Sequence, residues 1–291
     1  MPKTSSRFFL PLAFAQNLVV SGLIGSLRLL PYAARVGFMG WAMRNIVGPV
    51  AGYRTRVHQN LHLIWPDLPN SRVADLTRDV LDNVGRTLAE LYSPQEFKAY
   101  VAGSTLRGAG LAQVLDAQAQ GRGVILVSGH FGNHDIARAV LASRGMTVGA
   151  LYRPQRNPYF DQHFAATIRA ISEPLFPRGR RGLADLITHL RKGGMLGMLI
   201  DQHMRNGAPL TFLGHRALTA LSAADLALKY NCLLVPVYGI RQSDGLHFDL
   251  LIEPAIPHTT SAAMTQALNN SLEAQVRAHP GQWFWVHRRW K

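Results

Sequence analysis

The sequence predicts an α/β fold in which a central, mostly parallel or mixed β-sheet is flanked by helices. Short apolar runs rich in Val, Ile and Leu, bounded by Gly, Pro or polar residues, are typical of buried strands. Such runs occupy 123–129, 146–152, 195–200 and 232–240. Helices are expected between and after them, near 134–144, 158–171, 182–192 and 218–230. Strands that alternate with helices indicate a sheet with helices on its faces.

Two further elements complete the predicted core. Residues 73–92 carry apolar side chains at helical spacing with charges opposite, which predicts a long amphipathic helix. HFDLLIEPA (247–255) follows the last apolar run through the turn QSDG, which predicts one more strand paired with its predecessor.

The N-terminal residues 1–50 are expected to form a membrane-associated helical segment, followed by one domain over 51–291. Residues 8–27 are twenty residues without a charge, which is the length that spans a bilayer core, although Gln16 and Asn17 lie at their centre. The competing interpretation is a signal peptide, because Lys3 and Arg7 precede the run and Ala13-Phe14-Ala15 resembles a cleavage site.

The segment after residue 27 mixes cations with aromatic residues. Arg28, Arg35 and Arg44 alternate with Tyr32, Phe38 and Trp41, which suits a helix at a headgroup interface; the alternative is a buried helix that caps the domain. The segment QWFWVHRRWK (282–291) repeats this mixture, so that its tryptophans belong either to the core or to a membrane-facing edge.

The charge balance points to an acidic partner. The chain has 31 Lys and Arg against 17 Asp and Glu, a net charge of +14, which suits nucleic acid, anionic lipid or an acidic protein. The one cysteine, Cys232, lies in an apolar run, so no disulfide framework exists.

The stretch GHFGNHD (129–135) is the candidate active site. His130 directly follows an apolar strand, where chemistry concentrates in open α/β sheets. If the chain turns at Gly132, with Asn133 as helix N-cap, Asp135 reaches one imidazole nitrogen and leaves the other as a general base. The simpler alternative is a helix whose first turn holds an acid and whose cap is a histidine.

No protein nucleophile or metal site accompanies this pair. Ser128 is the nearest hydroxyl and GxSxG is absent, so the base is expected to activate a substrate hydroxyl. Asp201-Gln202-His203 with His215 lacks a spacing such as HExxH, so no metal is expected. Several arginines follow strand ends or loops, where they hold phosphates or are simply solvated: Arg153, Arg156, Arg178, Arg180 and Arg181.

The stretch GHFGNHD resembles the HxxxxD/E signature of glycerolipid acyltransferases, in the form found in bacterial lipid A biosynthesis acyltransferases. Other blocks resemble that family in the same order over roughly residues 10–291: HQNLHLIWPDLP (58–69), YRPQRNP (152–158), IDQ (200–202), FLGHRALT (212–219) and WFWVHRRWK. The chain departs from the family's usual pattern at His134 in place of Trp, at Asp135 in place of Glu and in TFLG, which has one Phe fewer.

The resemblance implies the glycerolipid acyltransferase fold and transfer of an acyl chain from acyl carrier protein or coenzyme A to a hydroxyl of a membrane glycolipid. It places the enzyme on the bacterial inner membrane, with the catalytic domain facing the cytoplasm. It implies His130 as base and Asp135 as its partner. Substrate contacts and support are then expected from Asn133, Arg153, Arg156, Arg178, Arg180, Asp201 and Gln202.

The sequence leaves more than one acceptor and more than one class of function open. The departures leave a lipid A precursor, a lysophospholipid or an aminolipid as acceptor. The thioester is a co-substrate, and no cofactor is expected. One rival is a basic, membrane-associated nucleic-acid-binding protein, although the cations do not gather on one helix and no nucleic-acid partner is expected. Another is a lipid esterase in which His130 activates water.

Overall fold

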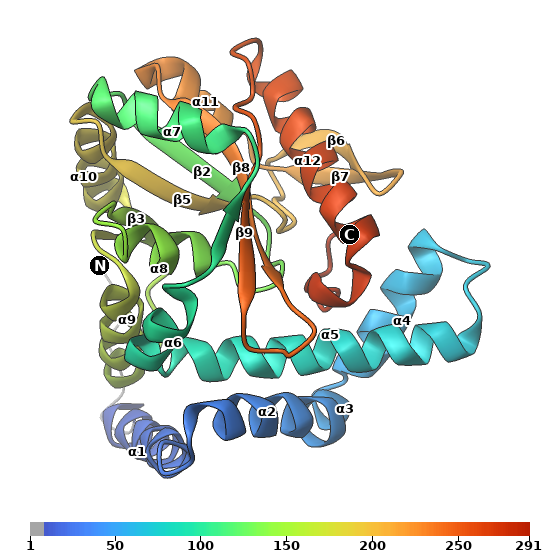
Figure 1. Cartoon of the computed structure of the whole chain (residues 1–291). Helices are drawn as coiled ribbons and strands as arrows, with labels where there is room; N and C mark the ends of the chain where they lie inside the picture. Colours follow the sequence, from blue (N-terminus) through green and yellow to red (C-terminus); the bar gives the residue numbers. More distant parts are fainter. Residues whose placement is uncertain (1–8) are drawn as a thin grey trace.

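The computed structural model describes residues 9–291, which build a seven-stranded sheet with helices on both faces (Figure 1). The strand order is β1-β9-β8-β2-β5-β3-β4, and only β8 and β9 pair antiparallel. The predicted α/β class with a mostly parallel sheet is therefore confirmed. The strands are β1 (Thr105–Arg107), β2 (Val124–Ser128), β3 (Val148–Tyr152), β4 (Leu175–Pro177), β5 (Met195–Leu199), β8 (Leu233–Arg241) and β9 (Phe248–Ile252).

Strand β2 is central, and its side chains alternate between two cores. Val124 and Leu126 pack in one cluster with helices α6 (Pro94–Val101), α7 (Gly110–Ala119) and α8 (Ile136–Ala142). Ile125 and Val127 pack on the opposite face with α10 (Arg180–Arg191), α11 (Ser222–Tyr230) and α12 (Ser261–Ala278). Because both faces are covered, every residue of this strand is apolar until Ser128, which is the pattern that revealed it in the sequence.

The predicted helices are present, with ends shifted by a few residues. The match is closest for α9 (Pro158–Ile171), where the Asn157 side chain accepts hydrogen bonds from the N–H groups of Tyr159 and Phe160. Several elements went unpredicted. They are the helices α4 (Tyr53–Ile64), α6, α7 and α12, the short strands β1 and β4, and the hairpin of β6 (Ala208–Phe212) and β7 (His215–Thr219).

The tryptophan-rich end of the chain is part of the core. Trp283 and Trp285 are fully buried, and Phe212 of the hairpin packs against both Trp283 and Trp290. Arg289 is also buried and donates to the carbonyls of Leu218 and Gln202. For the two buried tryptophans, the membrane-facing alternative is wrong.

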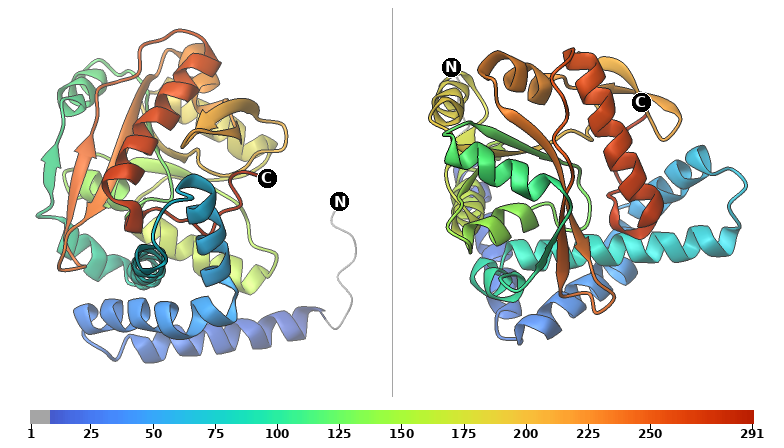
Figure 2. Two further views of the ribbon diagram at one scale, coloured as in Figure 1. Left: turned by 90° about the vertical axis from the view of Figure 1, so that its right-hand side faces the viewer. Right: turned by 45° about the horizontal axis from the view of Figure 1, so that its top comes forward.

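The N-terminal helices form a layer beneath α5 (Asn70–Leu91), as Figures 1 and 2 show. The layer contains α1 (Phe9–Leu27), α2 (Tyr32–Ala42), a π-helical turn (Met43–Val47) and α3 (Gly48–Val50), and α4 (Tyr53–Ile64) leads from it into α5. A Cβ on Gly85 would lie 2.1 Å from the carbonyl oxygen of Met39, so glycine permits the close contact between α2 and α5.

Arg35 corrects the expectation of an interfacial cation at this position. Its guanidinium is buried and donates to the carbonyls of Leu27, Arg28 and Leu30 at the end of α1, and it pairs with Glu96 at 3.3 Å. The side chain therefore joins α1 to the domain instead of facing headgroups.

Large apolar side chains are nevertheless exposed on this layer. Phe38 and Trp41 stack on each other at 5.9 Å between ring centroids, each close to half exposed. Further exposed members are Phe14, Leu18, Leu23, Leu29, Ile46, Val47 and Val50. Among residues 9–291, no helix combines the length and the apolar character needed to cross a membrane.

Candidate active site

The loop 129–135 turns sharply after β2 because of Gly132. This residue has φ +53°, and a Cβ there would lie 1.8 Å from the carbonyl oxygen of Gly239. Only glycine accepts both the left-handed conformation and the contact. The turn buries Phe131 in the tryptophan cluster and leaves His130 at the end of the sheet.

His130 is held by Asp201, which lies at the end of the neighbouring strand. Strands β2 and β5 are parallel with Ser128 opposite Leu199, so the residues two positions further on lie side by side. The His130 Nδ1 lies 2.7 Å from Asp201 Oδ1, and the His130 backbone N–H donates to Asp201 Oδ2 at 2.7 Å. The Trp283 Nε1–H donates to the same Oδ2 at 2.9 Å. With Nδ1 protonated toward the carboxylate, Nε2 carries the free lone pair.

Asp135 does not occupy the position that the sequence suggested. Its Oδ1 accepts a hydrogen bond from Arg138 Nη1 at 2.7 Å, one helical turn further on. Arg138 is buried and also donates to the carbonyls of Ile168 and Ser172. Asp135 thus neutralises a buried guanidinium, while the orienting carboxylate on His130 is Asp201. The reason is geometric. Asp135 stands at the start of α8, where it faces Arg138, whereas the parallel register of β2 and β5 places Asp201 beside His130.

The pKa values of the pair follow from this contact. Burial opposes the imidazolium of His130, but the charge and hydrogen bond of Asp201, with a smaller effect of Asp135, raise its pKa above the ordinary value. Burial opposes the Asp201 carboxylate too, but His130 holds its pKa far below the usual range. The carboxylate therefore stays ionised, and the imidazole is a stronger base than a free histidine.

The side chain of Asn133 is buried beneath the loop and bonded to other parts of the chain. Its Oδ1 accepts the N–H of Asp135 at 2.9 Å, and its Nδ2 donates to Glu90 Oε2 at 2.8 Å. The predicted contact of Asn133 with substrate stays a prediction. Asp135 and not Asn133 occupies the N-cap position of α8, and its side chain forms no capping hydrogen bond. The helix consequently begins at Ile136, two residues later than expected.

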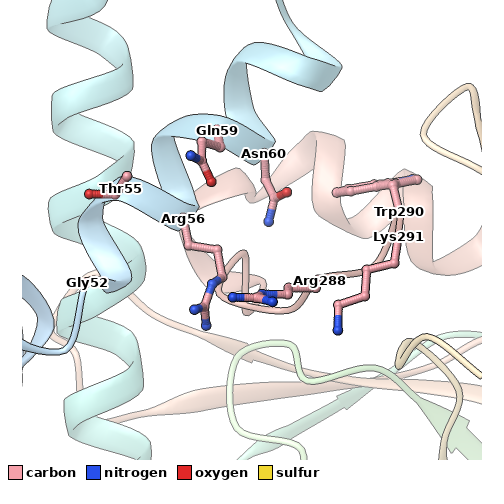
Figure 3. A pocket seen from close by; sticks show the side chains of 8 residues that line it. All are labelled: Gly52, Thr55, Arg56, Gln59, Asn60, Arg288, Trp290 and Lys291. Carbon is pink, nitrogen blue, oxygen red and sulfur yellow. The ribbon is translucent and has the colours of Figure 1, made fainter.

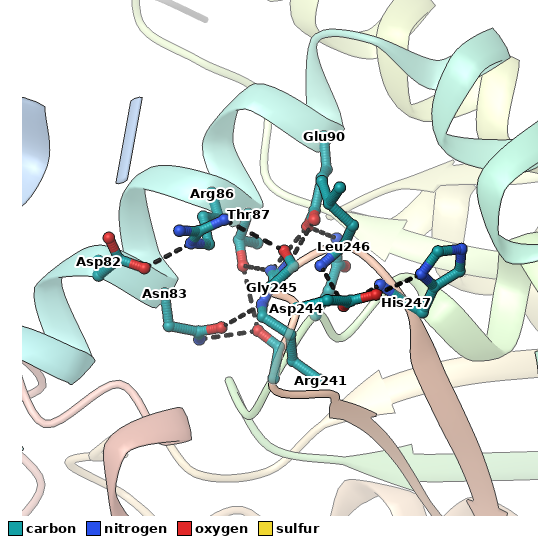
Figure 4. Close-up of polar contacts among 12 residues, drawn as sticks. Asp82, Asn83, Arg86, Thr87, Glu90, Arg241, Asp244, Gly245, Leu246 and His247 are labelled. Carbon is teal, nitrogen blue, oxygen red and sulfur yellow. Dashed lines mark hydrogen bonds and ion pairs between the residues drawn. The ribbon is translucent and has the colours of Figure 1, made fainter. Parts of the chain in front are cut away.

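A buried ion pair fixes the loop from below (Figure 4). Arg241 at the end of β8 donates through both terminal nitrogens to Glu90 of α5, and its Nε donates to Asn83 at 2.8 Å. Asn83 and Thr87 in turn donate to the carbonyl of Gly132 at 3.0 and 3.1 Å. These α5 residues lie one and two turns apart on one helix face, so a single helix holds the loop at Gly132 and Asn133.

The C-terminal segment completes the surroundings of His130. The Phe284 N–H donates to the His130 carbonyl at 2.9 Å, and the His287 ring lies edge-on to the His130 ring at 4.5 Å between centroids. Burial lowers the pKa of His287 to about 4, and among the described residues its Nε2 has no hydrogen-bond partner. No sequence pattern singled out His287, Glu90 or Arg241.

Three of these groups have the geometry to hold a metal ion. One ligand atom each of His130, Asp201 and His287 lies within 4.8 Å of the others. The first two are already bonded to each other through Nδ1 and Oδ1. This set differs from the one considered in the sequence, where Asp201 was grouped with His203 and His215.

The remaining predicted residues lie at the same edge of the sheet but do not contact His130. Arg153 and Arg178 follow the paired ends of β3 and β4, and the Arg178 N–H donates to the Tyr152 carbonyl. Their exposed guanidinium groups have no ion-pair partner among residues 9–291, and the same holds for Arg156 and Arg180. Gln202 is exposed, and its carbonyl accepts from Arg289 at 3.3 Å.

Sequence comparison identifies a matching protein family and several similar proteins. The model of the family described as bacterial lipid A biosynthesis acyltransferase matches residues 1–291. The lipid A biosynthesis lauroyltransferase of Escherichia coli K12 is 26% identical, over 81% of this chain and 78% of its own. A lipid A biosynthesis acyltransferase of Haemophilus influenzae is 23% identical over 80% and 74%. The phosphatidylinositol mannoside acyltransferase of Mycobacterium tuberculosis is 25% identical over 62% and 58%.

Proposed function

Because the chain belongs to the bacterial lipid A biosynthesis acyltransferases, and is thus an acyltransferase, we propose that it transfers a fatty acyl chain from acyl carrier protein to a hydroxyl of a lipid A precursor. The observation that carries this mechanism is the 2.7 Å contact between His130 Nδ1 and Asp201 Oδ1. It leaves Nε2 of a partly exposed imidazole free to accept a proton.

The reaction proceeds by direct attack of the acceptor. His130 Nε2 takes the proton of the lipid hydroxyl while the hydroxyl oxygen bonds to the thioester carbonyl carbon. The tetrahedral intermediate then expels the thiolate, which takes the proton from the imidazolium, so that an ester and a free thiol result. The Asp201 carboxylate stabilises the imidazolium between these two steps.

Ser128 does not compete as a nucleophile. Its side chain is buried at the end of β2, and among residues 9–291 its hydroxyl has no hydrogen-bond partner. A serine nucleophile needs a base within hydrogen-bond reach. The absence of such a contact supports direct transfer over an acyl-enzyme.

We further propose that the N-terminal layer rests on the cytoplasmic face of the inner membrane. Large apolar side chains of α1, α2 and α3 are exposed, and these helices lie on the side of α5 that faces away from the sheet. Exposed apolar side chains on helices of this kind suit contact with a headgroup interface. The net charge of +14 favours anionic headgroups and an acidic carrier protein, or the phosphates of coenzyme A as alternative donor.

A second acceptor class has its own support. The similarity to a phosphatidylinositol mannoside acyltransferase suggests that the fold also serves other sugar-bearing lipids. A lipid A precursor is preferred because the family model covers the whole chain. A lysophospholipid or aminolipid acceptor remains an alternative with no separate observation in its favour, and a nucleic-acid-binding function leaves the buried catalytic loop unexplained.

The proposal is tested by incubating the purified full chain with acyl carrier protein thioester and a lipid A precursor in detergent micelles. His130→Ala should lower transfer by about 10²–10⁴-fold, whereas His62→Ala, an exposed histidine on α4, should leave it unchanged. Free fatty acid is measured in the same samples. Equal transfer by His130→Ala removes His130 from the mechanism, and fatty acid release without acceptor identifies a hydrolase.

A further inference from the structure

A polar pocket of about 360 Å³ lies between α4 and the C-terminal segment (Figure 3). None of the 17 Asp and Glu residues of the chain lines it. Its walls consist of Gly52, Thr55, Arg56, Gln59, Asn60, Arg288, Trp290 and Lys291. The pocket therefore combines three cations with hydroxyl and amide groups.

The three cations are uncompensated. Arg56, Arg288 and Lys291 form no ion pair with any part of the chain from residue 9 onward, and Arg56 and Arg288 line the same pocket from α4 and from the C-terminal segment (Figure 3). Like charges at short range repel, and an anion between them removes that cost. Neighbouring Arg289 differs, because it is buried and donates to Thr219 Oγ1 at 2.6 Å.

Two side chains in the wall of the pocket, Asn60 and Trp290, are held in place by hydrogen bonds within the chain. Asn60 Nδ2 donates to the carbonyls of Trp285 and His287 at 2.6 and 2.9 Å. The Trp290 Nε1–H donates to the Phe212 carbonyl at 3.1 Å. Ligand binding therefore has no ordering cost to meet at these two side chains.

The pocket shares a segment with the active site. Arg288 follows His287, whose ring touches the ring of His130 at 4.5 Å between centroids. A ligand at Arg288 would therefore bind next to the segment that packs against His130. This adjacency separates the pocket from an arbitrary basic patch.

We propose that this pocket binds a phosphate group of a substrate, through guanidinium forks of Arg56 and Arg288 with Lys291 as a further charge. The inference rests on the proposed function in one respect only: the phosphate belongs either to the lipid acceptor or to the pantetheine arm of the donor. Both carry the same chemistry, and kinetics distinguishes them.

The first test reads the pocket without catalysis. His130→Ala protein is treated with phenylglyoxal with and without inorganic phosphate, at ionic strength matched with potassium chloride, and modified arginines are mapped by mass spectrometry. Phosphate should slow modification of Arg56 and Arg288 several-fold. Arg54, exposed on the same helix but outside the pocket, is the internal control. Equal protection of all three, or none, overturns the proposal.

The second test assigns the phosphate with the full-length enzyme. Arg56→Gln combined with Arg288→Gln should raise one KM by about tenfold or more with little change in kcat, whereas Arg54→Gln should change neither. A rise in acceptor KM that vanishes with an acceptor lacking its phosphate places the lipid there, and a rise in donor KM places the pantetheine arm there. Unchanged KM for both substrates refutes the site. If the wild type transfers no acyl group, the proposed function fails, while the protection experiment still reports on the pocket.

Discussion

Asp201 forms two hydrogen bonds with His130: its Oδ1 lies 2.7 Å from the ring Nδ1, and its Oδ2 accepts the backbone N–H at 2.7 Å. One carboxylate thus sets both the orientation of the imidazole and the position of its backbone. Asp201→Asn keeps the shape but removes the charge that stabilises the imidazolium, so kcat should fall by about 10²-fold or more. Steady-state kinetics of acyl transfer measures this. As a control, Asp185→Asn changes an exposed carboxylate on α10 and should leave kcat at the wild-type value. A wild-type kcat in Asp201→Asn would show that the Asp201 carboxylate has no catalytic effect.

The same contact predicts the pH dependence of the reaction. His130 must be unprotonated to act as base, and its pKa is raised above the ordinary value, so kcat/KM should fall as the pH drops through that raised pKa. In Asp201→Asn the main influence that raises the pKa is gone, and the acid limb should move to lower pH. Profiles of kcat/KM for both proteins decide it.

The neighbouring histidines should not contribute to this limb. Burial lowers the pKa of His287 to about 4, and burial also lowers that of His134 despite nearby Asp135. Neither ring therefore gains a proton in the range where His130 does. An acid limb that stays in place in Asp201→Asn would show that another group controls it.

Asp135 should matter for stability more than for proton transfer. In Asp135→Asn, buried Arg138 loses its counter-charge, which should lower the free energy of unfolding by about 3–5 kcal/mol. Chemical denaturation measures the loss. Removing the exposed carboxylate of the Asp75–Arg78 pair should cost less than about 1 kcal/mol. If Asp135→Asn were stable yet as inactive as Asp201→Asn, Asp135 would be the working partner of His130.

Two glycines with positive φ should respond differently to alanine. At Gly145, φ is +78° and space is open, so alanine should cost about 1–2 kcal/mol from strain alone. At Gly132, a Cβ also collides with the Gly239 carbonyl at 1.8 Å, so alanine should cost more and displace His130. Melting temperature and acyl transfer are measured for both. Equal losses would mean that the loop relaxes around the added methyl.

Much of the sheet could be predicted from the sequence because its central strands are covered on both faces. A strand such as β2 is then apolar at every position, and this run is visible without any homologue. The hairpin β6–β7 gave no such signal, since it lies outside the main sheet and its residues alternate in burial. Arg35 was misjudged for a related reason: the sequence does not show which face of α2 packs on α5.

The candidate site was predictable where it is local and not where it depends on strand register. His130 at the end of an apolar run was evident, and so was the need for a turn at Gly132. Asp201 is 71 positions away from His130, and only the pairing of β2 with β5 brings the two together. A carboxylate five positions along the chain was the more obvious partner, but a helix start carries it elsewhere. Glu90 and His287 have no local pattern at all.

The attachment of segment 282–287 to loop 129–135 has a consequence for the synthesis of the protein. Gly132 donates its N–H to the Gln282 carbonyl, and Phe284 donates to His130. During translation, the loop is synthesised roughly 150 residues before these partners. It therefore lacks these two hydrogen bonds until the C-terminal segment has been made. A nonsense mutation just upstream of Gln282 should therefore abolish activity, because loop 129–135 then lacks the groups that hold Gly132 and His130, although every strand of the main sheet is encoded.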